Sequence, residues 1–218
     1  LTPELHTEGE KIAELAILAE AEDVCRPHRL TASLFDADLH KYREIDIDLP
    51  AGDDTTRTII DEAAGLPAPE LLLLNDADHT YAKIRFDDTS LETVEHRLTE
   101  IEDELTRAVI WTALWNLTRD GELTAVDYVG GVVKHEAYET NTTLLATACA
   151  NANFAIAHYV SEADREQVRT DYAEAIWGHL DEAEPASDAQ LVLARAAIRA
   201  LAATPEESGT ARLKALLS

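Results

Sequence analysis

The sequence predicts a multidomain chain in which a small antiparallel β-sandwich is followed by an all-α, irregular superhelical segment. Three observations carry this prediction. Up to about residue 87, short runs alternate apolar and polar residues with a period of two. Beyond Asp87, apolar residues recur at three- and four-residue spacings, as on one face of a helix. The chain has 218 residues, whereas one typical domain has about 100–150, so two compact units are expected.

Six strands are predicted in the first part. The clearest contains Ile45, Ile47 and Leu49, which point to one face while the acidic residues between them point to the other. Such a strand is half-buried. The breaks between strands are rich in Asp, Asn, Gly and Pro, which favour turns. The predicted strands occupy residues 12–20, 29–35, 42–49, 55–60, 70–74 and 80–86.

Seven helices are predicted in the second part. In the first of them, Leu91, Val94 and Leu98 lie on one apolar stripe, and Thr89 with Glu92 has the spacing of a capping box. Similar start signals occur at Thr124, Ser161, Ser187 and Thr204. Short polar connections favour antiparallel neighbours, as in a HEAT/armadillo-like array without a strict repeat. The helices are predicted at residues 90–104, 106–118, 125–137, 141–159, 162–180, 188–202 and 205–217.

The change of period places a domain boundary between Phe86 and Ser90. The tail has no Gly or Pro stop signal, so the helical domain is expected to continue beyond Ser218. Its apolar side chains Leu213, Leu216 and Leu217 are then expected to lack a partner within this chain. The predicted limits are 1–87 for the β-sandwich domain and 88–218 for the helical domain, which is truncated at its C-terminal end.

Composition excludes several classes of partner. Asp and Glu number 43 against 18 Lys and Arg, which gives a formal charge of −25 and repels nucleic acids and anionic membrane surfaces. No run approaches the roughly 18 apolar residues that span a bilayer. Cys25 and Cys149 have no disulfide-framework or zinc-ribbon spacing, so a cytoplasmic location is expected. The absence of Met and the start at Leu1 indicate a chain cut from a longer reading frame.

The string from His135 to Glu139 most resembles a catalytic motif. A zinc-peptidase helix presents His-Glu-x-x-His, so that two imidazoles share one face. Glu139 stands where the second imidazole is needed, and we interpret the string as a solvated helix end. Other candidate sites are weaker still. Cys149 lies in an apolar run where a buried, inert thiol is expected, and Trp111 with Trp115 is expected to pack in the core.

Two pairs of aspartates could offer oxygen ligands to Ca²⁺, but neither has the Gly and distal Glu of an EF-hand loop, so hairpin turns are expected instead. Gly130-Gly131 lacks the setting of a phosphate-binding loop. No catalytic, cofactor-binding or metal-binding residue is therefore assigned. The two aspartate pairs are Asp36 with Asp38 and Asp76 with Asp78.

Residues 71–87, LLLLNDADHTYAKIRFD, resemble a hairpin of the aminopeptidase N family that ends the β-sandwich after the catalytic domain. That hairpin has a strand, an Asn-containing turn, an aromatic residue at the position of Tyr81 and a closing acid at the position of Asp87. The likeness covers nearly the whole chain. Residues 26–30 resemble the actinobacterial-type branch of the family, and residues 107–111 and 117–123 resemble the opening helices of its C-terminal domain.

The resemblance implies a parent enzyme with an N-terminal β-domain, a thermolysin-like zinc domain, this sandwich and a long helical domain. The chain lacks the family's GxMEN and HExxH motifs and the downstream Glu ligand, so no catalytic or metal residue is carried over. Zinc is implied for the parent alone. The implied partners are the catalytic domain of the same polypeptide and, in the intact enzyme, a peptide substrate. The implied role is a scaffold and cover for the substrate chamber.

An independent acidic helical protein-interaction module is the alternative. The acidic composition and the succession of solenoid-like helices are the evidence for it. The reading frame upstream of Leu1 distinguishes the two hypotheses, because only the first requires GxMEN and HExxH there.

Overall fold

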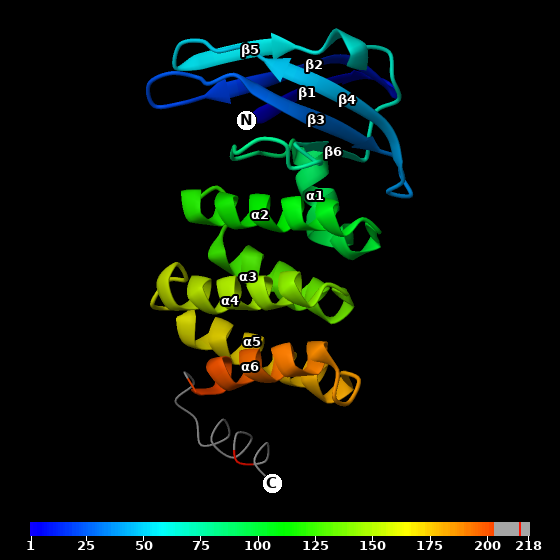
Figure 1. Ribbon diagram of the computed structural model, residues 1–218. Helices are drawn as coiled ribbons and strands as arrows, with labels where there is room; N and C mark the ends of the chain where they lie inside the picture. Colours follow the sequence, from blue (N-terminus) through cyan, green and yellow to red (C-terminus); the bar gives the residue numbers. More distant parts are fainter. Residues whose placement is uncertain (203–213, 215–218) are drawn as a thin grey trace. The chain divides into compact units, whose positions relative to one another are not determined.

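The computed structural model describes residues 1–202 and residue 214. The chain forms two compact units, Leu1–Asn116 and Leu117–Ser218. The first contains two β-sheets and the first helices, and the second contains the later helices (Figure 1). The predicted fold class, a small antiparallel β-structure followed by a helical segment, is confirmed.

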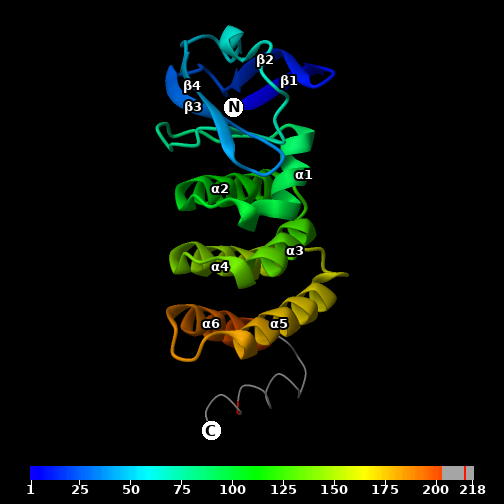
Figure 2. The ribbon, with the colours of Figure 1, turned by 90° about the vertical axis from the view of Figure 1, so that its right-hand side faces the viewer.

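The first unit contains two three-stranded antiparallel sheets, which lie as two layers (Figures 1 and 2). Their strand orders are β1-β2-β5 and β4-β3-β6. In β4, Ile45 and Ile47 are buried while Glu44 and Asp46 are exposed, as the period-two pattern predicted. The strands are β1 (Thr2–Glu8), β2 (Lys11–Glu20), β3 (His28–Phe35), β4 (Lys41–Leu49), β5 (Thr55–Ile59) and β6 (Leu71–Leu74).

Two strand assignments differ from the prediction. Strand β1 was not predicted, because it contains Pro3 and mostly polar residues; it lies at a sheet edge, where proline is tolerated. Residues 80–86 were predicted as a strand and belong to neither sheet. Their alternation is real, since Tyr81 is exposed and Ile84 is buried. Alternation reports which side chains are buried, not whether the backbone lies beside another strand.

Helix α1 (Asp88–Arg97) begins at Asp87, whose side chain accepts a hydrogen bond from the Ser90 N–H at 3.1 Å. Thr89 had been predicted to start this helix. The Ser90 hydroxyl in turn accepts a 2.8 Å bond from the Leu72 N–H of β6. The helix start is therefore fixed to the sheet. The last strand ends at Leu74, and the domain limit at residue 87 stays a prediction.

The prediction of a single helix over residues 90–104 is wrong. Helix α1 ends at Arg97, a 3₁₀ turn follows at Leu98–Glu100, and α2 (Glu104–Asp120) begins after it. Asp103 explains the new start, because its carboxylate accepts a 2.8 Å bond from the Thr106 N–H. That bond also lowers the pKa of Asp103.

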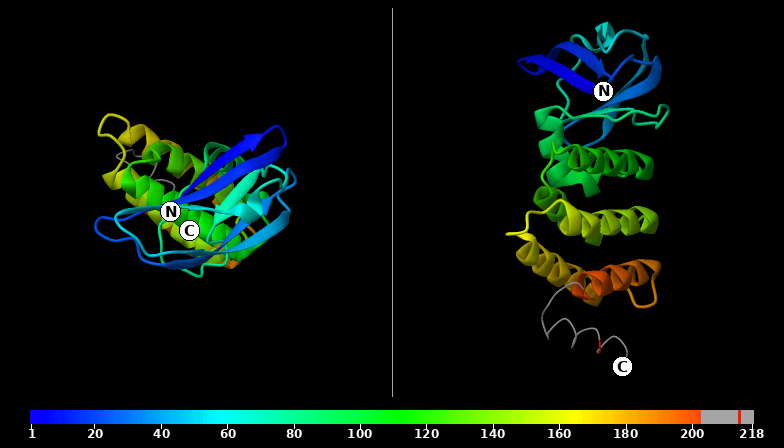
Figure 3. Two further views of the ribbon diagram at one scale, coloured as in Figure 1. Left: turned by 90° about the horizontal axis from the view of Figure 1, so that it is seen from above. Right: turned by 90° about the vertical axis from the view of Figure 1, so that its left-hand side faces the viewer.

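The second unit stacks its helices in two pairs, α3 with α4 and α5 with α6 (Figures 2 and 3). Two predicted start signals are confirmed: Thr124 accepts the Asp127 N–H at 3.1 Å, and Ser187 accepts the Gln190 N–H at 3.0 Å. No helix in the described part of the chain has the length and hydropathy to cross a membrane. The helices are α3 (Ala125–His135), α4 (Thr142–His158), α5 (Arg165–Glu182) and α6 (Asp188–Ala202).

The predicted helix 205–217 lies outside the described residues. The same holds for the expectation that Leu213, Leu216 and Leu217 are left without a partner.

Candidate functional site

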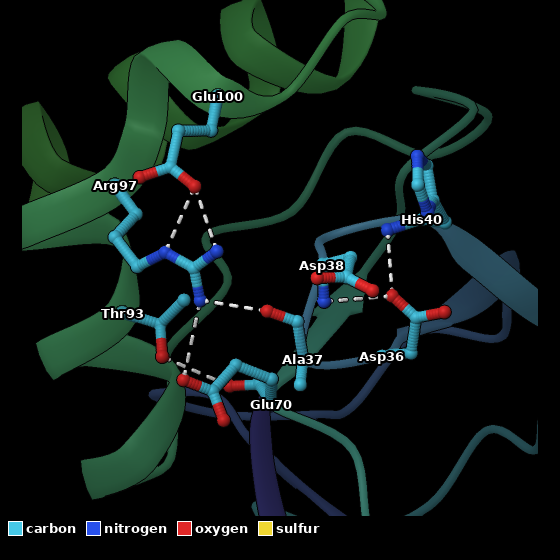
Figure 4. Close-up of polar contacts among 8 residues, drawn as sticks. All are labelled: Asp36, Ala37, Asp38, His40, Glu70, Thr93, Arg97 and Glu100. Atoms are coloured by element: carbon cyan, nitrogen blue, oxygen red, sulfur yellow. Dashed lines mark hydrogen bonds and ion pairs between the residues drawn. The ribbon is translucent and has the colours of Figure 1, made fainter.

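Three polar clusters among the described residues combine carboxylates with His, Cys or Lys, and the first lies at the turn between β3 and β4. It consists of Asp36, Asp38 and His40, whose potential ligand atoms all lie within 4.8 Å of one another (Figure 4). Asp36 is partly buried and the other two are exposed. By composition alone, such a group could hold a divalent cation.

The contacts of this turn argue for a structural role. One carboxylate oxygen of Asp36 accepts the N–H groups of Asp38 at 3.0 Å and His40 at 2.9 Å, which closes the turn (Figure 4). The guanidinium of Arg97 donates to the Ala37 carbonyl at 2.9 Å. This fixed positive charge beside the turn opposes a second cation there. The hairpin turn predicted at Asp36 and Asp38 is present.

Arg97 links the turn to helix α1. It also pairs with Glu100, at 3.0 Å and 2.7 Å, and lies 3.6 Å from Glu70 (Figure 4). The hydrogen bond from Arg97 lowers the pKa of the Glu100 carboxyl. Thr93 donates to the Glu70 carbonyl at 3.0 Å. These contacts anchor α1 to the β3–β4 turn and to the residue before β6.

The second cluster surrounds Asp76. This residue was predicted to lie in a hairpin turn, and its burial was not foreseen: it is only 3% exposed. Its carboxylate accepts the hydroxyls of Ser33 at 2.7 Å and Thr106 at 2.6 Å, and lies 2.6 Å from the Lys41 ammonium. Strands β3 and β4 and helix α2 therefore meet at one carboxylate.

The Asp76 cluster is an ion pair with Lys41, supported by hydrogen bonds from two hydroxyl groups. Burial opposes the charge on Lys41, but hydrogen bonds to Asp76 and Glu44 outweigh it and raise the Lys41 pKa. Both oxygens of Asp76 already accept bonds, since Ser33 and Lys41 share one and Thr106 takes the other. A buried carboxylate that accepts from three side chains of neighbouring elements is satisfied within the protein and stabilises the packing of those elements.

The third cluster includes the string that resembled a zinc-peptidase motif. The prediction of a solvated helix end is wrong, because His135 and Glu136 are each 2% exposed. Helix α3 gives way to a 3₁₀ turn at Glu136–Tyr138, and the carboxylate of Glu136 lies 2.6 Å from Nδ1 of His179 in α5. The Cys149 thiol lies 3.5 Å from the other Glu136 oxygen.

Burial and mutual contacts raise the pKa values of the three ionisable groups in this cluster. Burial raises the pKa of Glu136, and the hydrogen bond to the Glu136 carboxylate raises the pKa of His179. Burial also raises the pKa of the Cys149 thiol far above its ordinary value. A thiolate is the reactive form, so the inert thiol predicted at Cys149 is consistent with this environment.

The three side chains Cys149, Glu136 and His179 do not fit a catalytic zinc site. Such a site needs about three ligands and an open position for water. Both Glu136 oxygens contact His179 or Cys149, and Glu136 and Cys149 are buried while His179 is partly buried. Among the described residues, the turn at Asp36–His40 is the one group of three with metal-ligand spacing.

Sequence reasoning missed the burial of Asp76 and Glu136. Asp76 follows a run of four Leu residues in a segment that reads as a turn, and no spacing marks its donors Lys41 and Thr106. His179 lies 43 residues from Glu136. Pairs this distant are brought together by helix packing and leave no local signal.

Comparisons with known proteins agree with the fold. Residues 71–218 match the family model described as ERAP1-like C-terminal domain. The chain is 34% identical over 221 residues to Aminopeptidase N of Streptomyces lividans, an alignment that covers 95% of this chain and 25% of that protein. The chain thus spans about a quarter of the length of the curated relative that it matches.

Proposed function

The chain belongs to the aminopeptidase N family and represents part of its C-terminal region, and from this premise we propose that it is a non-catalytic segment of a zinc-dependent aminopeptidase. The parent enzyme removes N-terminal residues from peptides. In it, this segment serves as scaffold and as cover for the substrate chamber. One observation carries the proposal: nearly the whole chain aligns with a quarter of a protein named as an aminopeptidase.

The polar clusters support a non-catalytic role. Asp76 and Glu136 are buried carboxylates whose oxygens are bonded to side chains of neighbouring elements. A hydrolytic site instead needs groups that face substrate and water. These carboxylates stabilise packing, as expected for a scaffold.

Zinc belongs to the parent in this proposal, because the His135–Glu139 segment does not fit the metal. Metal-assisted hydrolysis then takes place on residues outside this chain. The stacked helix pairs of the second unit resemble the arrays with which solenoid proteins present broad surfaces (Figure 3). We place the parent in the cytoplasm, in keeping with the two buried free thiols, Cys25 and Cys149.

Fragment complementation tests the proposal. The polypeptide upstream of Leu1 and the 218-residue chain are expressed separately, and cleavage of aminoacyl-p-nitroanilides is measured with Zn²⁺ present. We expect no turnover from the chain alone and increased turnover when it is added to the upstream fragment. Zinc-dependent turnover by the chain alone, abolished by His135→Ala, would overturn the non-catalytic assignment.

The role as cover is tested on substrates of different length in the complemented enzyme. We expect the chain to lower cleavage of long peptides relative to dipeptides, because a covered chamber restricts entry. An unchanged ratio with and without the chain would contradict this role. An upstream reading frame with a start codon near Leu1 and no zinc motif would instead favour the independent interaction module.

A further inference from the structure

The segment 80–86 has one buried and one exposed side although it belongs to neither sheet. The side chain of Ile84 is 4% exposed and packs within the first unit, whereas Tyr81 is 104% exposed. Scattered exposed apolar residues are common. Tyr81 differs in that the backbone on both sides of it is held in place.

The loop before Tyr81 is fixed by the side chain of Asn75. This amide donates to the Thr80 carbonyl at 2.9 Å and accepts the Thr80 N–H at 3.1 Å. Asn75 itself is buried and has a left-handed backbone conformation, with φ of 57°. The Thr80 hydroxyl also bonds Nδ1 of His28 at 2.7 Å. The residue that precedes Tyr81 is therefore held at two backbone atoms and at its side-chain hydroxyl.

The backbone after Tyr81 is bonded to the first residue of the chain. The nitrogen of Leu1 donates to the Lys83 carbonyl at 2.6 Å, and the N–H of Arg85 donates to the Leu1 carbonyl at 2.8 Å. Figures 1 and 3 show the N-terminus beside the segment that follows β6. Leu1 is thus bonded to both neighbours of Ile84, Lys83 and Arg85. In parallel strands, one residue bonds in this way to the two residues that flank its partner, so Leu1 is paired with Ile84.

This register has a direction. Because the pairing is parallel, the polypeptide that precedes Leu1 runs past Ala82 and Tyr81, and the chain after Leu1 continues toward Arg85 and into β1. Counting back from Leu1 and Ile84, the third residue upstream is level with Tyr81. Strands pair about 4.8 Å apart, so a side chain at that position lies within contact distance of the Tyr81 ring.

We propose that the polypeptide immediately upstream of Leu1 in the parent aminopeptidase forms a short parallel strand along residues 81–84, and that the domain from which it leads covers Tyr81. The inference rests on the proposed function, since it requires a domain upstream. Tyr81 supplies an aromatic face with a polar tip, which suits an interface between domains of one chain.

Photo-crosslinking in the full-length parent tests this inference. Tyr81 is replaced by p-benzoylphenylalanine, and the linked peptides are identified by mass spectrometry. Tyr138, which is 71% exposed in the second unit, receives the same replacement as the matched control. We expect an intramolecular product between position 81 and residues upstream of Leu1, including the third, and no such product from position 138. A product confined to residues after Asp88, a product between two molecules, or no product would overturn the inference.

A second measurement uses side-chain substitutions in the same parent enzyme. We expect Tyr81→Ser to lower the midpoint of thermal unfolding, Tyr81→Phe to lower it less, and Tyr138→Ser to leave it unchanged. Equal midpoints for Tyr81→Ser and the wild type would count against a covered Tyr81. A parent that lacks a zinc motif yet gives the crosslink defeats the proposed function alone. An active zinc enzyme without the crosslink defeats this inference alone.

Discussion

Thr106 of α2 donates a 2.6 Å hydrogen bond to the carboxylate of Asp76, 30 residues earlier in the loop that follows β6. The bond joins the first long helix to the loop that leaves the sheet. Ser33 and Lys41 reach the same carboxylate from β3 and β4. One acidic side chain thus links three elements of the first unit, and its removal is the most direct test of the packing described above.

We expect Asp76→Asn to destabilise the 218-residue chain by about 2–4 kcal/mol, because the ion pair is lost and two hydroxyl donors face a neutral amide. Chemical denaturation measures the change. Asp78→Asn is the matched control, since Asp78 is exposed and has a left-handed conformation that Asn tolerates. Its expected effect is within about 0.5 kcal/mol. Similar losses for the two variants would show that burial of Asp76 is unimportant.

The Asn75 clamp predicts a graded series. Asn75→Ala loses two hydrogen bonds and puts Ala, which tolerates the left-handed conformation less well than Asn, at this position, so we expect a loss of about 2–4 kcal/mol. Asn75→Gly loses the same bonds without the conformational cost, so it is expected to be about 1 kcal/mol less destabilising. Unfolding curves of the two variants give the comparison. If Gly proves as costly as Ala, the left-handed backbone contributes nothing.

The Glu136–His179 pair predicts a pH dependence. Both folded-state pKa values are raised, so the folded chain binds more protons than the unfolded chain once the pH exceeds the ordinary His value of 6.5. Stability supplied by His179 is fully present below that pH and is lost as the pH rises through its folded pKa. The free energy of unfolding should fall in this window, by at most about 1.4 kcal/mol per pH unit for one proton.

Substitutions test the origin of that slope. His179→Gln and Glu136→Gln should flatten the fall in stability above pH 6.5, while Glu174→Gln on an exposed position of α5 should leave it intact. Denaturation at a series of pH values provides the measurement. A slope that persists in His179→Gln would assign the dependence to other groups.

Thiol chemistry tests the burial of the two cysteines. Cys25 and Cys149 are each at most 3% exposed, and burial raises the pKa of Cys149. We expect neither to react with a thiol-specific reagent in the native chain within the time in which both react after unfolding in guanidinium. Ala150→Cys, at the exposed position next to Cys149, is expected to add one rapidly reacting thiol. Rapid labelling of Cys149 itself would contradict the buried environment.

The sequence by itself determined the fold class and most element positions. Periodicity is a local property, so the alternation at Ile45 and Ile47 located β4, and the capping residues Thr124 and Ser187 located two helix starts. Local signals failed where competing caps lay close together, as Asp87 replaced Thr89 and Asp103 divided one predicted helix into two. They failed again at residues 80–86, where apolar and polar residues alternate although the segment belongs to neither sheet.

Only the tertiary structure decided which polar side chains are buried. Asp76 and Glu136 are buried, although the sequence around each predicts exposure to solvent. A hydropathy value ranks a carboxylate as polar and takes no account of the donors that pair with it in the fold. Their partners, Thr106 and His179, lie 30 and 43 residues away, and no spacing rule connects them. The pairing of Leu1 with the segment around Ile84 is of the same kind. Long-range contacts are set by how whole elements pack, so each side chain's burial and charge follow from the fold and not from its neighbours in sequence.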